Sequence, residues 1–192
     1  MAAPQALCSC ALFLVLLLAP HACTAASTVL QDKCRSYAAG TQEEYDYCIR
    51  TLQSGRASAA AAAAADARSL AAIAANVARE AARATATKIA AWKDAETVPA
   101  RQESLTACAK EYRAAVHGLR AAAEAAVSAR VAEGLQVAQK RLSDALGAPL
   151  RCDAAFSAAG EPSSPLDAAD RDLDKVINLA ISILPVPSSP GV

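Results

Sequence analysis

Apolar residues recur at steps of three and four along four long segments of this chain, a spacing that gives a helix one buried face. We expect helices over about residues 56–93, 100–128, 131–146 and 165–184, with Trp92 as a core anchor of the first. No segment has the alternating pattern that is typical of a half-buried strand. The residues expected to be buried are Leu70, Ile73, Val77, Ala81, Thr85, Ile89 and Trp92; Leu105, Cys108, Tyr112, Ala115, Val116, Leu119, Ala123 and Ala126; Val131, Leu135, Ala138, Leu142 and Ala145; and Leu166, Ala169, Leu173, Val176, Ile177, Ala180, Ile181 and Leu184.

Proline, glycine and serine set the predicted ends of these helices. Pro99 cannot continue a helix interior, so the first two helices should be separated just before it. Gly147 and Pro149 are expected to kink or end the third helix. Ser164 is expected to cap the last helix, with Pro165 at its first position.

A shorter pair of helices is predicted ahead of the four, over residues 28–53. Gly40 interrupts the helical pattern there, and Thr41 and Glu44 have the spacing of a capping box at the start of the second helix. Three of the four tyrosines fall in this unit, and we expect them to be packing aromatics: Tyr37, Tyr45 and Tyr47.

The two ends of the chain are expected to lie outside the fold. Residues 1–26 hold an apolar run followed by small residues, which resembles a secretory signal peptide cleaved after Ala26. That run is too short for a membrane span, which needs about 20 apolar residues. The expected organisation is a signal peptide at 1–26, a helical hairpin extension at 27–55, a four-helix bundle at 56–185 and a flexible Pro/Ser tail at 186–192.

The charges of the chain balance. All 19 basic and 19 acidic residues follow residue 31, so the mature part is neutral overall. A neutral chain offers no basic surface to nucleic acid or to an anionic membrane, and we expect neither as a partner. Alanine dominates the apolar residues and buries little surface, so the core should need covalent support.

Four of the seven cysteines remain once the signal peptide is removed: Cys34, Cys48, Cys108 and Cys152. An even number in a secreted chain favours disulfides. Three pairings are possible, and the sequential one suits two local hairpins best. A zinc site is disfavoured, because no C-x-x-C spacing occurs and His117 is the only histidine of the mature part.

We find no catalytic arrangement in the sequence, and we expect neither a cofactor nor a metal ion. One histidine leaves no Ser-His-Asp or Cys-His group, and no glycine-rich phosphate loop occurs. The composition therefore favours a rigid binding module over an enzyme. The second long helix carries an outward stripe at helical spacing, which is either a contact surface or solvated surface, formed by Thr106, Lys110, Arg113, His117, Arg120 and Glu124.

Several short motifs follow one another in a characteristic order. They are Cys34 with Tyr45-Asp-Tyr-Cys48, then Leu105-x-x-Cys108-x-x-x-Tyr112, Leu142-Ser-x-Ala-Leu146, Cys152-x-x-Ala155-Phe156, and Ser164-Pro165-Leu166 before Asn178-Leu-Ala-Ile-Ser-Ile183. Through this order and the spacing of the four cysteines, nearly all of the mature chain resembles the plant invertase and pectin methylesterase inhibitors.

The resemblance implies an all-α fold, an up-down four-helix bundle with an N-terminal α-helical hairpin. It implies two disulfides, Cys34–Cys48 and Cys108–Cys152. It also implies secretion to the apoplast and cell wall, where the protein would inhibit a carbohydrate-active enzyme by forming a protein complex. The expected partner is pectin methylesterase or invertase, bound by a monomer of this chain.

The two target classes differ between the third and fourth cysteines. Invertase-directed members carry a Pro-Lys-Phe tripeptide there, which blocks the sucrose site, whereas residues 130–136 of this chain hold none. Methylesterase inhibitors instead lay bundle helices over the pectin cleft of the enzyme. We therefore expect pectin methylesterase as the target, with invertase as the alternative, and contacts from Lys110, Arg113, His117, Arg120, Glu124, Glu133 and Gln136.

Two functions of other classes stay open. Alanine enrichment is compatible with a structural or signalling wall protein that has lost its inhibitory contacts. Four helices can also enclose a lipid, although alanine-rich faces favour close helix approach over a cavity. Binding of either target enzyme, or of a fluorescent fatty acid, separates these possibilities.

Overall fold

The computed structural model describes residues 28–161 and 164–186 of the chain. The expected signal peptide, and the tail beyond Val186, lie outside these described residues. Within them the fold is all-α, as predicted, and contains no strand. The helices are α2 (Val29–Ala38), α3 (Gln42–Leu52), α4 (Ala57–Ala62), α5 (Ala67–Ala95), α6 (Pro99–Ala126), α7 (Val131–Ala158) and α8 (Asp167–Ile183).

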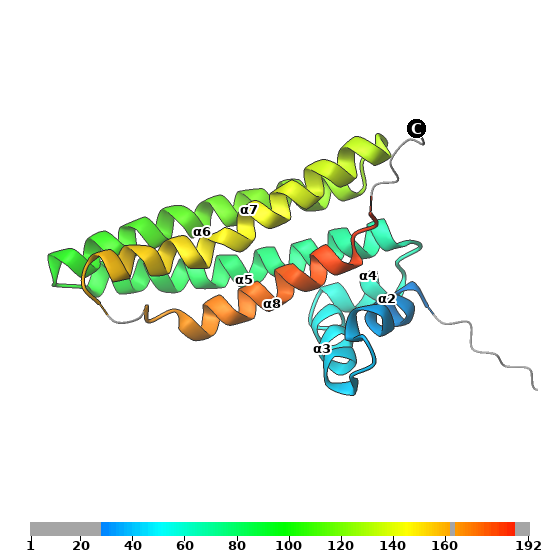
Figure 1. The fold of residues 1–192 in the computed structure, drawn as a ribbon, viewed down its shortest axis with the longest axis horizontal. Helices are drawn as coiled ribbons and strands as arrows, with labels where there is room; N and C mark the ends of the chain where they lie inside the picture. Colours follow the sequence, from blue (N-terminus) through cyan, green and yellow to red (C-terminus); the bar gives the residue numbers. More distant parts are fainter. Residues whose placement is uncertain (1–27, 162–163, 187–192) are drawn as a thin grey trace, which may run out of the picture.

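The four long helices α5 to α8 form an up-down bundle. Each packs against its neighbour in the chain, and α8 closes the bundle by returning to α5 (Figure 1). The interior holds the larger side chains Tyr112, Phe156, Leu70, Leu119 and Leu142, all essentially without solvent exposure. Alanines make up much of the buried faces of α5 and α6, which pack against each other, and such small side chains let helix backbones approach closely. These alanines are Ala71, Ala74, Ala75, Ala78, Ala82, Ala115, Ala122, Ala123 and Ala126.

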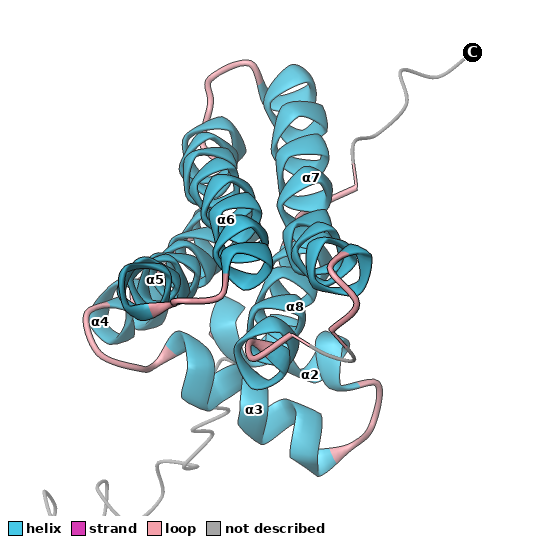
Figure 2. Ribbon diagram, turned by 90° about the vertical axis from the view of Figure 1, so that its left-hand side faces the viewer, coloured by secondary structure: helices cyan, strands magenta, loops and turns pink. Residues whose placement is uncertain are grey.

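The short hairpin of α2 and α3 packs on α5 and α8, on the side of the bundle away from α6 and α7 (Figure 2). Cys34 and Cys48 join its two helices. The predicted capping box at Thr41 is wrong, because that hydroxyl donates to the carbonyl of Ala38 at 2.9 Å and caps nothing. A capping box forms instead at Thr28, whose side chain and backbone exchange hydrogen bonds with Gln31.

The first long helix is broken near its start, contrary to the single helix expected over residues 56–93. Its alanine tract forms the separate α4, and residues 63–66 leave the helix before α5 begins. Asp66 causes the restart, because its extended backbone and its carboxylate, which accepts from the Ser69 amide at 2.7 Å, make an N-cap. The apolar periodicity could not show this break, since alanine suits both sides of it.

The third helix does not end at Gly147–Pro149 as expected. It continues to Ala158, with Pro149 buried inside it. Proline leaves one carbonyl of the preceding turn without its helical donor. Burial of the Pro149 ring and the disulfide at Cys152, three residues on, offset that loss and keep the backbone helical.

Three further local expectations change. The last helix begins at Asp167, since Ser164 accepts from the amide of Leu166 within a turn that precedes it. Trp92 is 40% exposed and Val131 45% exposed, so neither is a core residue. Both lie within one turn or so of a helix end, where the inward face extends beyond the packed part of the bundle.

No helix in the described part of the chain is long and apolar enough to cross a membrane.

Candidate partner-binding surface

The α6–α7 hairpin is tied together at the end where α6 begins. Cys108 and Cys152 form a disulfide with a Cα–Cα distance of 4.5 Å. One turn earlier on α6, the buried hydroxyl of Ser104 lies 3.1 Å from the carbonyl of Ala155 and 3.1 Å from the carbonyl of Ala100 in its own helix, and it donates to either. These two links fix the register of the antiparallel pair, so a side chain on one helix keeps a constant neighbour on the other.

The opposite end of the hairpin is also held. Arg68 of α5 donates through Nε to the carbonyl of Ala126 at 2.9 Å and through Nη2 to the carbonyl of Ser128. These carbonyls belong to the last turn of α6 and the loop beyond it, where helix carbonyls lack internal donors. Gly134 of α7 is buried here, and a Cβ atom on it would stand 2.4 Å from the carbonyl oxygen of Ala125. The turn is therefore closely packed and rigid.

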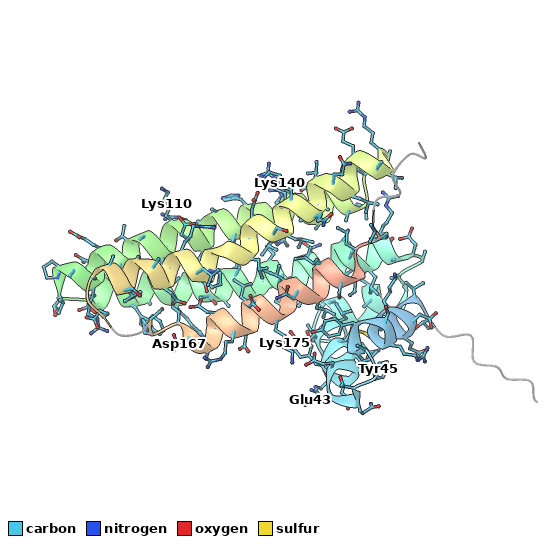
Figure 3. The ribbon with its side chains drawn as sticks, in the orientation of Figure 1. Glu43, Tyr45, Lys110, Lys140, Asp167 and Lys175 are labelled. Atoms are coloured by element: carbon cyan, nitrogen blue, oxygen red, sulfur yellow. A yellow bond between two sulfur atoms is a disulfide. The ribbon has the colours of Figure 1, made fainter. Side chains whose placement is uncertain are left out.

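The polar stripe on α6 is exposed, as a contact surface requires. Lys110, Arg113, His117, Arg120 and Glu124 all face solvent. Figure 3 shows Lys110 on α6 and Lys140 on α7 projecting from the same edge of the bundle. Arg120 and Glu124 pair at 2.9 Å on the helix surface, a bond worth little in water. Lys110 and Arg113 have no carboxylate within ion-pair distance among the described residues, so their charges are free to meet a partner.

A shallow groove of about 480 Å³ runs beside this stripe, between α6 and α7. Its floor is made of small residues of α6 such as Gly118, and its walls carry His117, Arg141 and Arg151. Arg151 is held at 2.5 Å by Glu111. Arg141 has no ion pair within the described part, and Asp144, which also lines the groove, pairs with Lys140 at 3.0 Å, so the groove carries charges of both signs.

Arg141 and Arg151 were not among the contacts expected from the sequence. The expected helix ended at residue 146, which separated Arg151 from the face that carries Arg141. Once α7 is known to run to Ala158, the two residues lie ten positions apart on one helix, about 2.8 turns, and both line the groove. The missing information was the continuation of the helix through Pro149.

Glu133 and Gln136 lie on the first turns of α7 and are exposed. The segment 130–136, expected as the connection between helices, is mostly helical, and the actual turn spans residues 127–130. In the register fixed by the disulfide, Gln136 lies level with Glu124 of α6. All seven expected contact residues are exposed positions of the α6–α7 hairpin, and their role in binding stays a prediction.

A buried polar contact links α6 to α8 behind this surface. The Tyr112 hydroxyl donates to the carboxylate of Asp170, which is 6% exposed. Burial raises the pKa of Asp170 to about 6, and burial also raises the pKa of the neighbouring Asp153. The described residues contain no group of three side chains suited to hold a metal ion.

Comparison with known proteins gives a consistent result. The family model for plant invertase/pectin methylesterase inhibitors matches residues 28–183. No curated protein matches the chain. A crystal structure of mutant form A of a pectin methylesterase inhibitor from Arabidopsis superposes with a TM-score of 0.60 at 18% identity, covering 83% of this chain and 99% of that one.

A second crystal structure, of a pectin methylesterase inhibitor from Arabidopsis thaliana, gives a TM-score of 0.55 at 18% identity and covers 84% of this chain and 99% of that one. At this identity the structures show a shared fold. The family match extends from the first turn of α2 to the last residue of α8. The chain therefore belongs to the plant invertase/pectin methylesterase inhibitor family.

Proposed function

We propose that this protein is a secreted inhibitor of pectin methylesterase that acts as a monomer in the cell wall. The observation that carries the proposal is the α6–α7 hairpin, which is fixed at both ends and exposes a basic stripe along its length. The family description and both solved neighbours name inhibitors, which supports an inhibitory function over a catalytic one.

Rigidity suits this surface to inhibition. A partner that binds it orders few backbone torsions, so little of the contact free energy is lost to ordering. Acidic groups of a partner can pair with the basic side chains of Lys110, Arg113 and Arg141. Such charge complementarity raises the rate of association and the specificity of binding. The proposed inhibitor covers the substrate cleft of the enzyme with this face and excludes pectin by occupying its place.

Pectin methylesterase is favoured over invertase for a local reason. The Pro-Lys-Phe tripeptide of invertase-directed members is absent between Cys108 and Cys152. Residues 131–136 are part of α7, so no extended segment is offered there for insertion into a sucrose site. Invertase inhibition remains the alternative, because the family description names both enzymes.

Parallel assays of the purified chain against both enzymes test the proposal. We expect concentration-dependent loss of methylesterase activity, with a stable complex on size-exclusion chromatography, and no effect on invertase. Inhibition of invertase alone would reverse the assignment of the target. Failure to bind or inhibit either enzyme would favour a non-inhibitory wall protein instead.

A further inference from the structure

A second groove lies on the other side of the bundle from the α6 stripe. It has a volume of about 720 Å³ and runs between α7, α8 and the N-terminal hairpin. In Figure 3 Asp167 and Lys175, both on α8, lie along the lower edge of the bundle, whereas Lys110 and Lys140 lie along the upper one, and of these four only Lys175 lines the groove. The α7 wall of the groove is apolar except for Asp153, and the α8 wall is mostly charged.

Two of its carboxylates, Asp170, which is buried, and Asp153, which is half-buried, each have one oxygen without a hydrogen-bond partner. Asp170 is 6% exposed, and while one oxygen accepts from Tyr112, its Oδ2 atom is buried with no hydrogen-bond partner. The Oδ1 atom of Asp153, on the facing wall, is likewise buried without a partner. A buried acceptor without a donor costs free energy, more so when it is charged.

The cations already present at the groove do not neutralise this pair. Lys175 lies 3.0 Å from Glu44 and 4.1 Å from the ring centroid of Tyr47, so it is engaged with the hairpin. Arg171 lines the groove and its charge lowers the pKa of Asp170, but it forms no ion pair with Asp153 or Asp170, and burial outweighs its effect. Burial raises the pKa of both aspartates, as expected for carboxylates that are withdrawn from water without a direct ion pair.

A countercharge for the two aspartates could also come from the segments outside the described structure, if these held a basic side chain. Residues 1–27, 162–163 and 187–192, outside the described structure, contain neither lysine nor arginine. A metal ion is a poor occupant, since no group of three ligating side chains occurs among the described residues. An organic cation needs no such cluster, because its N–H groups can reach two separate carboxylates.

We propose that this groove binds an organic cation, an alkylammonium or guanidinium group on an aliphatic stem, between Asp153 and Asp170. The stem lies along the apolar wall of Leu146, Pro149 and Leu150, where Leu150 is 71% exposed. Such a cation is carried by a free polyamine or by a lysine or arginine side chain of a partner. The site is independent of the proposed inhibition, because it uses neither α6 stripe residues nor their groove.

Calorimetry and amide NMR on the purified, disulfide-intact chain at pH 7 test the site with two probes, 1,4-diaminobutane and Nα-acetylarginine amide. We expect saturable binding above that of sodium chloride at equal ionic strength, with shifts at Asp153 and Asp170. The probe that binds more tightly identifies the source of the cation. If neither probe binds more tightly than sodium, the proposal is wrong.

Matched variants locate the binding. Asp170→Asn keeps an acceptor for Tyr112 but removes the charge, and should weaken binding about tenfold or more, as should Asp153→Asn. Asp174→Asn is the control, because Asp174 lines the same groove but already accepts from Asn178 at 3.0 Å. Equal loss in all three variants would indicate general charge attraction and overturn the site. Asp170→Asn should also raise the melting temperature, which shows that lost binding is not lost folding.

Discussion

The protonation state of the buried Asp170 carboxylate affects the stability of the fold. Burial raises its pKa from an ordinary 3.8 to about 6, so the folded chain holds the proton more tightly than the unfolded chain does. Such a group contributes its full stabilisation of the folded state at pH values below its pKa in the unfolded chain. The stabilisation is lost as pH rises through its pKa in the folded chain. Asp153, whose pKa burial also raises, acts with the same sign.

We therefore predict that Asp170 and Asp153 lower the melting temperature as pH rises from 4 to 7, against the opposite effect of Glu44, Asp66 and Glu96, whose pKa values are lowered. The loss should correspond to about 1–3 kcal/mol for Asp170, from the size of its pKa shift. Differential scanning calorimetry across this range measures it. The double variant Asp153→Asn/Asp170→Asn should gain melting temperature relative to the wild type as pH rises from 4 to 7. Parallel profiles of the two proteins would contradict the assignment.

Gly134 shows how close the α6–α7 turn is packed. An added Cβ would lie 2.4 Å from the backbone oxygen of Ala125 and 2.9 Å from Cβ of Ser128. Backbone cannot move aside as a flexible side chain can, so Gly134→Ala should destabilise the fold by about 1–3 kcal/mol. Chemical denaturation measures the change in unfolding free energy.

Gly118→Ala is the matched control in the neighbouring helix. Its nearest atom, the carbonyl oxygen of Arg141, would be 3.6 Å from the new Cβ, which is ordinary contact. The helix interior then favours alanine by about 1 kcal/mol, so this variant should be slightly stabilised. If both variants behave alike, the close approach at Gly134 is not a constraint on the fold.

At the scale of the elements, the two disulfides should contribute unequally to the stability of the fold. Cys108–Cys152 closes a separation of 44 residues between α6 and α7, whereas Cys34–Cys48 closes 14 residues within the hairpin. Cys108→Ser/Cys152→Ser should cost about 2–5 kcal/mol and lower the melting temperature of the bundle. Cys34→Ser/Cys48→Ser should mainly loosen α2 and α3. A bundle melting temperature that is equal with and without reductant would show that the longer bond is not stabilising.

The stripe on α6 is the part of this helix that we expect to bind the methylesterase. Replacing Arg113, His117 and Arg120 by alanine should weaken binding of the methylesterase about tenfold or more, because a few charged residues dominate many interfaces. Surface substitutions of this kind should leave helicity unchanged, since alanine is the better helix former. Surface plasmon resonance and circular dichroism measure the two effects.

The control for that variant is a set of equally exposed positions on another helix. Arg83→Ala, Thr87→Ala and Lys88→Ala alter the solvent face of α5, which the proposed complex does not use. This variant should bind normally. An α6 variant that keeps full affinity would mean that the stripe is ordinary solvated surface.

Helical periodicity predicted the four bundle helices and the buried face of α6 well, because leucine, cysteine and tyrosine there recur at the spacing of a single face. It failed where alanine occupies every face, as in the break at Asp66, and where tertiary contacts override a proline, as at Pro149. The pair of Tyr112 and Asp170 was also beyond sequence reasoning. These residues stand 58 positions apart, and only the packing of α8 brings them together.

At the scale of the whole molecule, one lysine connects the hairpin to the bundle. Lys175 of α8 pairs with Glu44 at 3.0 Å and stands over the ring of Tyr47 at 4.1 Å. Both partners belong to α3, so this contact helps to seat the hairpin. The ion pair is about one-third exposed on each side, which limits its contribution to about 1 kcal/mol or less.

Lys175→Met should therefore speed amide hydrogen exchange in α2 and α3 by less than about tenfold, while α6 and α7 stay protected. The bundle does not depend on this contact, so its melting temperature should barely change. Lys110→Met, which alters an exposed lysine on the opposite edge, is the control and should leave the hairpin unaffected. Unchanged exchange in the hairpin of Lys175→Met would show that its seating rests on apolar packing alone.

The alanine-lined contact between α5 and α6 has a consequence for how this sequence can change over time. In most cores the damaging substitutions are those that replace a large side chain with a smaller one. Such substitutions can remove very little at the buried alanines Ala74, Ala78, Ala82 and Ala122. A substitution there almost always adds bulk, and added bulk forces the helices apart. Natural variation at these positions should therefore be bounded by an upper limit on side-chain size, while exposed alanines such as those at residues 62–63 are free to vary in both chemistry and number.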